Sequence, residues 1–521
     1  MLGLAILVCG GAERRLPVPQ PVALLICGVL LGFIPALRGV TLPPEAVLLV
    51  FLPALLYWDS LTASLREIRH NLRSIVLAST VLVIVTAAVV AVVAQAFGMP
   101  AGPAWVLGAA VAPTDATAVG MLARGLPRRT MTILRAESLV NDGTALVVYG
   151  LAVGVTVGEE HLSPGHVGGL FLLAYVGGAA AGLATAWLTG EARRRLDDPL
   201  VENAVSVLTP FTAFLLAELI HASGVLAVVV CGLVLSQRGP RTVSAATRQV
   251  AVAFWSLTTF LLNGALFVLI GLQAQASIRG LTSVDVRRGL IAVGLISAAV
   301  IGTRWVWINT MPYLVRALDR RPQQRLRRVG FRQRTVIGAS GFRGAVSLAA
   351  ALAVPETLHS GAPFPDRDLI VFVTTGVVVI TLVVQGLLLP AMIRFARLPL
   401  DTGAEEERRL AETTAAREAM AALPDLAAEL GTSSAVVDRT LAEYEKHLLQ
   451  LDADGEAEDG DPARQAEHQY SELRLALIGH KRATVVRLRD EQLIDDSVLR
   501  QIQSRLDIEE VRLTRRQVLD A

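Results

Sequence analysis

Apolar segments recur along this 521-residue chain as far as Leu400, and they limit the folds open to it. A helix of about 20 apolar residues spans the hydrocarbon of a bilayer, because it satisfies its backbone hydrogen bonds internally. We count thirteen such segments, of which the first is short for a span. They cover residues 1–12, 20–37, 42–60, 72–98, 103–122, 131–157, 165–189, 200–220, 223–237, 252–276, 287–315, 335–357 and 368–396. The sequence therefore predicts an all-α polytopic membrane protein.

Composition supports this class and argues against several others. The chain is 53% hydrophobic and 18% charged, whereas a soluble domain carries about 25% charged residues. Cys9, Cys27 and Cys231 lie in apolar segments without metal-like spacing, and we expect no disulfide and no cofactor. A net charge of +2 gives no reason to expect nucleic acid as a partner, and the chain has no P-loop motif. Any pumping must then use an existing ion gradient.

Arginines alternate between the connections of the apolar segments. The connections after the odd-numbered segments up to the eleventh are basic, with eight arginines in residues 316–334. Those after segments four, six and eight have no Lys or Arg. By the positive-inside rule, the N-terminus lies outside and the C-terminal tail in the cytoplasm. The Ala-, Val- and Arg-rich composition, with lysine only at Lys446 and Lys481, indicates a bacterial source and hence the inner membrane.

The sixth segment carries polar residues in mid-span, in the run 137–143. Glu137 and Asn141 are four residues apart, as are Ser138 and Asp142, so each pair shares a helix face and the two faces adjoin. Carboxylates inside a membrane are unfavourable and mark an ion or proton path. The alternative is a set of polar groups that join neighbouring helices, but that role rarely requires two acids in one span.

The fifth and twelfth segments are interrupted at mid-span. Residues 112–117 contain Pro113 and Asp115, and residues 338–344 contain three glycines and Arg343. Proline and clustered glycine break a helix, and broken helices are tolerated in a membrane where they line a cavity. Two antiparallel broken helices indicate an inverted repeat with a binding site at its centre. Ordinary kinks remain the alternative for each segment.

Four motifs follow one another through these segments. They are Phe51-Leu52-Pro53 with Asp59, Pro113-Thr114-Asp115, Glu137-Ser138 with Asn141-Asp142-Gly143, and Arg343-Gly344-Ala345-Val346-Ser347-Leu348-Ala349. In this combination residues 1–397 resemble the bacterial NhaP-type sodium/proton antiporters. These belong to the monovalent cation:proton antiporter-1 family, which also contains the animal sodium/proton exchangers.

The resemblance implies a homodimer of thirteen-helix protomers in the lipid bilayer. A moving core, residues 72–157 and 287–396, works against a dimerisation part, residues 1–60 and 165–276. Residues 398–521 then form a cytoplasmic helical tail. Residues 403–421, 431–451 and 463–518 have helical patterns, and the acidic stretch 452–461 is expected to be a linker. A regulatory or dimer-stabilising tail and a merely solvated one both fit.

The same resemblance assigns roles to single residues. Asp142 is the carboxylate that binds the cation and the proton. Ser138, Asp115 and the Thr114 carbonyl complete the shell of the monovalent cation. Asp115 has a second interpretation, as compensation for a helix dipole.

Further residues support this site. Glu137 pairs with Arg343, and Asn141 braces that pair. An acid that reaches the ion through water is Asp59, although Trp58 stands where it was first expected. Arg304, inside the eleventh segment, can snorkel or pair with an acid and has no assigned role.

The resemblance implies a secondary transporter that exchanges sodium or lithium for protons and contributes to pH homeostasis. The Asn141-Asp142 pair, where electrogenic relatives have two aspartates, implies electroneutral exchange. Potassium/proton antiport is the alternative within the class, and a gated cation channel is the alternative outside it. An enzyme is not expected, because no nucleophile with its base is recognisable.

Overall fold

The computed structural model describes residues 2–12, 18–37, 43–122, 126–158, 164–196, 198–318, 330–398, 403–453, 462–491, 493, 498–499, 502–503, 505–511 and 513. The chain folds as two compact units, Met1–Leu400 and Asp401–Ala521.

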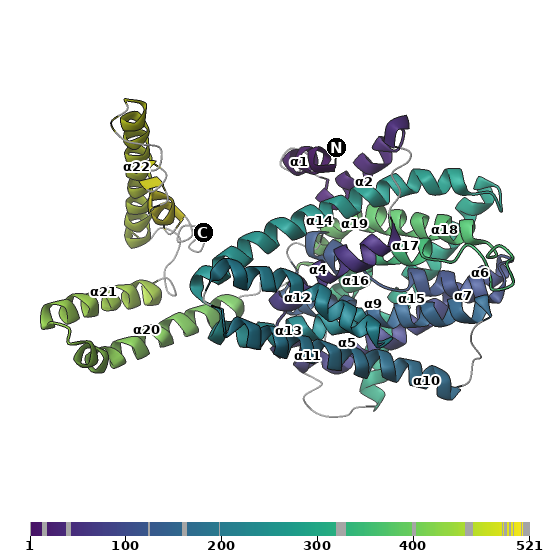
Figure 1. Cartoon of the computed structure of the whole chain (residues 1–521), viewed down its shortest axis with the longest axis horizontal. Helices are drawn as coiled ribbons and strands as arrows, with labels where there is room; N and C mark the ends of the chain where they lie inside the picture. Colours follow the sequence, from purple (N-terminus) through teal and green to yellow (C-terminus); the bar gives the residue numbers. More distant parts are fainter. Residues whose placement is uncertain are drawn as a thin grey trace. The chain divides into compact units, whose positions relative to one another are not determined.

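The described part of the first unit consists of helices and their connections, with an isolated β-bridge between Thr357 and Pro363 (Figure 1). The α-helices are α1 (Leu2–Ala12), α2 (Gln20–Leu31), α3 (Pro44–Ala46), α4 (Leu52–Thr62), α5 (Leu65–Val76), α6 (Leu82–Ala96), α7 (Ala101–Val111), α8 (Ala116–Leu122), α9 (Arg128–Val157), α10 (Pro164–Leu172), α11 (Gly178–Arg193), α12 (Pro199–Leu219), α13 (Gly224–Thr242), α14 (Ala245–Gly280), α15 (Val286–Leu318), α16 (Phe331–Ala339), α17 (Ala345–Leu352), α18 (Arg367–Ile380) and α19 (Gly386–Ala396). Wider π-helical turns over Val47–Phe51, Leu77–Val81, Leu173–Gly177 and Thr381–Gln385 join successive helices, and Pro35–Leu37 forms a 3₁₀ turn.

Eight helical stretches of the described residues are long and apolar enough to cross a membrane. They are Pro44–Thr62, Leu65–Ala96, Arg128–Val157, Gly165–Arg193, Pro199–Leu219, Ala245–Gly280, Val286–Met311 and Arg367–Ala396. The other predicted segments fall on the shorter helices α1, α2 and α13 and on the two interrupted segments. The polytopic all-helical architecture is confirmed, while the total of thirteen spans and the inverted repeat stay predictions.

Both interruptions expected from the sequence are present. The fifth segment is divided between α7 and α8, with Ala112–Asp115 outside regular helix, and the twelfth between α16 and α17. The two breaks meet, because the backbone N–H of Asp115 donates a 2.9 Å hydrogen bond to the carbonyl of Phe342. Unwound backbone from two distant segments therefore lies together in the interior of the unit.

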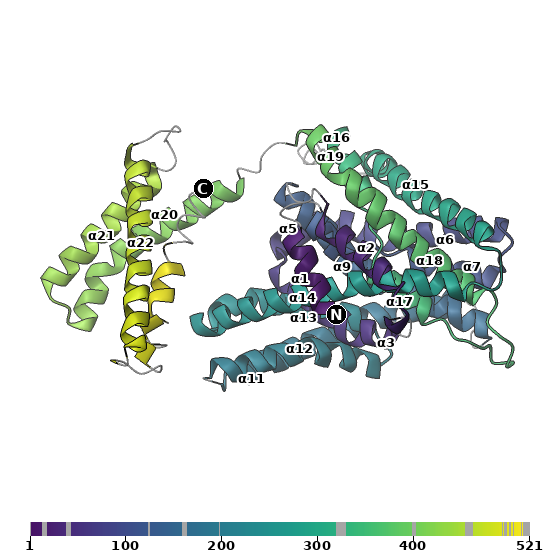
Figure 2. The same ribbon diagram turned by 90° about the horizontal axis from the view of Figure 1, so that it is seen from above.

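The helices around these breaks form two packed groups. One group contains α6, α7, α15 and α18, and the other contains α11, α12 and α13 (Figure 2); α12 and α13 also pack on α4. Each group has its own cluster of buried apolar side chains. Helix α9 contacts both groups, through α7 and through α13. The polar residues of α9 predicted from the sequence therefore lie on a helix between the two groups.

Glycines allow α14 and α2 to touch. A Cβ on Gly28 or on Gly271 would overlap backbone atoms of the opposite helix. Small residues of this kind bring helix backbones together in membranes, where the hydrophobic effect does not drive helix association. This close contact holds α14 against α2.

The described part of the second unit is also helical, with α20 (Gly403–Leu430) packed on α21 (Ser434–Ala453), followed by α22 (Pro462–Asp490). The first helix runs through Pro424 to Leu430, beyond the predicted end at residue 421. Arg482 forms 2.5 Å ion pairs with Asp507 and Glu510. Most of the expected linker lies outside the described residues, and a regulatory role of the tail stays a prediction.

Candidate functional site

Helix α9 buries all four polar residues predicted for it. The exposed fractions of Glu137, Ser138, Asn141 and Asp142 lie between 1% and 6%. The helical spacing places them on the two adjoining faces described above, inside the protein and away from lipid. Each polar group must therefore find a partner within the protein or in a cavity.

Ser138 and Asn141 bind the break of the fifth segment. The hydroxyl groups of Thr114 and Ser138 are 3.0 Å apart, and the Asn141 amide donates a 2.6 Å hydrogen bond to the Thr114 hydroxyl. The prediction that Asn141 braces a Glu137–Arg343 pair is wrong in this respect, because its amide reaches the unwound residue Thr114. Both side chains hold the break in place.

The two carboxylate oxygens of Asp115 have different surroundings. Oδ1 accepts hydrogen bonds from the backbone N–H groups of Thr117, at 2.8 Å, and Ala118, at 3.3 Å. It thus caps α8, which is the dipole-compensating role. Oδ2 lies against Gly344 of the other break. One oxygen of Asp115 therefore remains for a ligand.

Gly344 is necessary for this arrangement. A Cβ there would lie 2.7 Å from the Cβ of Asp115 and would overlap its carboxylate, whereas a Cβ on Gly338 would meet only Trp305, at 3.5 Å. We expect Gly344→Ala to reduce ion exchange by about a hundredfold, because displacing a reacting group by an ångström has effects of this size. Gly338→Ala, in the same interrupted segment, is the matched control and should keep wild-type exchange in vesicles. Equal activity of both variants would contradict the placement of Asp115.

Arg343 binds the break of the fifth segment. Its guanidinium donates hydrogen bonds to the carbonyls of Ala112 and Pro113, the latter at 2.7 Å, and its backbone N–H donates to the Thr381 hydroxyl. The arginine is 1% exposed. It therefore satisfies carbonyls that α7 leaves without helical partners.

Glu137 forms its ion pair with Arg304, and the predicted pairing with Arg343 is wrong. The Glu137 Oε1–Arg304 Nη1 distance is 2.6 Å, and both side chains are at most 7% exposed. The reason is steric. The stem of Arg304 passes directly over Gly341, where a Cβ would overlap its Cδ, and so reaches α9 from α15. Arg304, a single arginine in an apolar segment, indicated a buried ion pair. The sequence alone could not show whether Arg304 or Arg343 pairs with Glu137.

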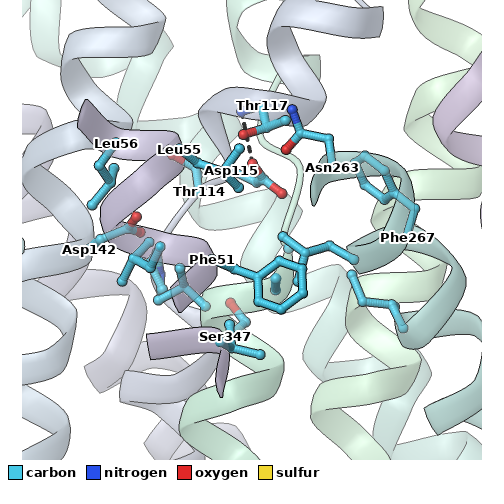
Figure 3. Close-up of a pocket in the computed structure, with 18 of the residues that line it drawn as sticks. Phe51, Leu55, Leu56, Thr114, Asp115, Thr117, Asp142, Asn263, Phe267 and Ser347 are labelled. Carbon is cyan, nitrogen blue, oxygen red and sulfur yellow. Dashed lines mark hydrogen bonds between the residues drawn. The ribbon is translucent and has the colours of Figure 1, made fainter. Parts of the chain in front are cut away.

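A cavity lies between α9, the break at Thr114, α8, α4, α14 and α17 (Figure 3). Its volume is about 50 Å³, enough for water or a small cation. The polar residues that line it are Asp59, Thr114, Asp115, Thr117, Asp142, Asn263 and Ser347. The cavity therefore brings together polar residues from five helices, α4, α8, α9, α14 and α17, and from the break of the fifth segment.

Asp142 is placed in this cavity without a partner. No described residue donates a hydrogen bond to its carboxylate or pairs with it as a cation. Asp59 shares the cavity, whereas Trp58 stacks on Trp255 with ring centroids 6.3 Å apart. Ser138 lies behind Thr114 and does not line the cavity. Among the described residues, no group of three His, Cys, Asp or Glu side chains is arranged for a resident metal ion.

Comparisons with known proteins identify the family and the fold. The model of the family described as sodium/hydrogen exchanger, transmembrane, matches residues 3–395. The chain belongs to this family. Its members exchange cations for protons across membranes, which makes the chain a multi-pass transporter, and the resemblance to NhaP-type antiporters is confirmed.

Individual relatives cover most of the chain. An uncharacterised Na+/H+ exchanger of Mycobacterium tuberculosis is 46% identical over 461 residues, covering 88% of this chain and 85% of the relative. The uncharacterised Na+/H+ exchanger YjcE of Escherichia coli is 30% identical, covering 88% and 87%. The structure of the sodium proton antiporter MjNhaP1 of Methanocaldococcus jannaschii shares the fold, with a TM-score of 0.55 at 19% identity, covering 74% of this chain and 97% of that one.

Proposed function

We propose that this protein is a secondary active antiporter that exchanges sodium or lithium for protons, one for one and electroneutrally. The observation that carries the proposal is the buried carboxylate of Asp142, which lines the cavity and has no partner in the part of the chain that the structure describes. An isolated negative charge in such a place is unfavourable, so the carboxylate holds either a proton or a cation. Competition for one carboxylate then couples the two fluxes.

Neighbouring oxygens complete the cation shell in this proposal. Asp115 supplies Oδ2 and Thr114 its carbonyl oxygen beside Asp142, while the Ser138 hydroxyl, outside the cavity lining, joins the shell through its 3.0 Å contact with the Thr114 hydroxyl. Oxygen donors of this kind suit hard cations. Asp59 contributes through water, since it lines the same cavity. Glu137, Arg304, Arg343 and Asn141 hold the helices that carry these ligands.

The position of α9 between two groups of helices supports alternating access. The Thr144 hydroxyl, two residues after Asp142, forms a 2.5 Å hydrogen bond with the Tyr175 hydroxyl. A Cβ on Gly143 would lie 3.3 Å from the Ser223 hydroxyl. These contacts join α9 to the part proposed for dimerisation, residues 1–60 and 165–276. Movement of the core, residues 72–157 and 287–396, would exchange them for others and open the site to the opposite side.

The cellular setting completes the proposal. The protein works as a homodimer in the inner membrane of a bacterium, with its N-terminus outside and residues 398–521 in the cytoplasm. Sodium leaves the cell as protons enter, or the reverse, according to the two gradients. In that setting the protein contributes to pH homeostasis.

Proton flux in proteoliposomes that hold a pH gradient tests this function. We expect external sodium or lithium to collapse the gradient, and clamping the membrane voltage to leave the rate unchanged, because no net charge moves. If only potassium collapses the pH gradient, the antiport mechanism stands and the transported cation is potassium. Leakage of a labelled cation without proton movement would contradict antiport and favour a channel.

A further inference from the structure

Asn263 is the cavity residue that neither the motifs nor the family assignment explain. It lies near the middle of α14, with Leu266, Phe267 and Ile270 of the same helix also lining the cavity. Its side chain is 8% exposed, and its carboxamide oxygen has no hydrogen-bond partner in the part of the chain that the structure describes. Buried amide oxygens are almost always paired, so this one requires an explanation.

The surroundings of Asn263 indicate which kind of partner its carboxamide oxygen would bind. In Figure 3 its side chain lies on the same side of the cavity as Asp115 and Thr117, across from Asp142. Oδ1 of Asp115 is occupied by the cap of α8, which leaves Oδ2. The Ser347 hydroxyl, also on the cavity wall and 1% exposed, has no partner among the described residues either. Among the described residues, no group donates to the Asn263 oxygen or pairs with the Ser347 hydroxyl on this cavity wall.

A cation satisfies such a set of oxygens. Two acceptor oxygens that face one buried space repel each other unless a proton donor or a positive ion lies between them. Amide and carboxylate oxygens together are typical ligands of hard cations. An apolar residue at position 263 would fit the remaining lining of α14 equally well, so the amide is not explained by packing.

We propose that Asn263 is a further ligand, directly or through one water, of the cation held by Asp142 and Asp115, from the side of the cavity across from Asp142. This inference rests on the proposed function and adds to it a ligand from α14. Because α14 belongs to the part proposed for dimerisation, the Asn263 oxygen reaches the cation only while the core faces α14 as it does here. Asn263 therefore sets cation affinity in this conformation.

Sodium/proton exchange by Asn263→Leu and Asn263→Asp, at alkaline pH in proteoliposomes, tests this role. We expect Asn263→Leu to raise the apparent KM for sodium by about tenfold and to change the maximal rate much less, because one ligand is lost. Asn263→Asp keeps the oxygen and adds charge, and it should lower the KM. Asn309→Leu makes the same change on another membrane helix, outside the cavity, and should leave the KM unchanged.

Three results would overturn the proposal. The first is an unchanged KM in Asn263→Leu. The second is a KM raised equally by Leu and Asp, which would make the amide a hydrogen-bond donor to Asp115. The third is an unchanged KM in Asn263→Asp, which decides the matter even if the leucine variant fails to assemble.

Thermal stabilisation of the detergent-solubilised protein by sodium separates this inference from the proposed function. If wild type is stabilised by sodium and Asn263→Leu needs about tenfold more sodium for the same shift, the ligand role holds even without exchange. Exchange in wild type with an unchanged sodium dependence in the variant would leave the function intact and contradict the ligand role.

Discussion

Asn in place of Asp142 is expected to abolish cation-coupled proton flux, by about a hundredfold or more, the scale on which removing a proton-transferring group acts. Asparagine keeps the shape of the side chain but cannot exchange a proton for a cation. Because the Asp142 carboxylate has no partner among the described residues, its neutralisation breaks no ion pair, and the variant should assemble and melt like wild type. Proton flux in proteoliposomes and thermal melting in detergent measure the two effects.

Asp198→Asn is the matched control for this variant. Asp198 caps α12 at the protein surface, where its Oδ1 accepts a 2.7 Å hydrogen bond from the N–H of Leu200. Asparagine caps helices as well as aspartate does, so exchange and stability should both be retained. Preserved sodium/proton exchange by Asp142→Asn would remove the basis of the mechanism.

Breaking the Glu137–Arg304 pair should destabilise the protein strongly. Both side chains are buried, and removing one partner leaves the other as an unpaired buried charge, at a cost of about 3–5 kcal/mol. We expect Glu137→Gln and Arg304→Met each to lower the melting temperature in detergent. The double variant should recover part of the loss, because no charge is then left alone.

Two comparisons make this prediction specific. The exposed pair of Arg439 and Glu443, at 3.3 Å, should contribute at most about 1 kcal/mol when it is removed. In a double-mutant cycle, Glu137 should couple more strongly to Arg304 than to Arg343, which binds the carbonyls of Ala112 and Pro113. Stronger coupling of Glu137 to Arg343 would refute the pairing found here.

Local sequence patterns predicted the helices and their interruptions well. Pro113 removes a helical hydrogen bond and the glycines at 338–344 lower helix propensity wherever they occur, so both breaks could be expected from the residues alone. The spacing on α9 likewise placed Ser138 and Asp142 on one buried face. These inferences need only residues that are close in sequence, so they require no knowledge of the folded structure.

Contacts between distant helices could not be predicted in the same way. Sequence pattern offered Arg304 and Arg343 as partners for Glu137, and the choice depends on the gap above Gly341, which exists only in the folded protein. Asn263 was missed because a single amide in an apolar helix has many uses. Only the packing of α14 beside α4 and α17 turns it toward Asp115.

The most direct test of the central claim is the number of protons released when sodium binds. A pH indicator in weakly buffered detergent solution reports protons, and calorimetry reports bound sodium. If proton and cation compete for Asp142, wild type should release about one proton per sodium at a pH where the sodium-free carboxylate is protonated, and about half a proton at the midpoint of its proton titration, whereas Asp142→Asn should release none. Sodium binding to wild type without proton release would contradict the account.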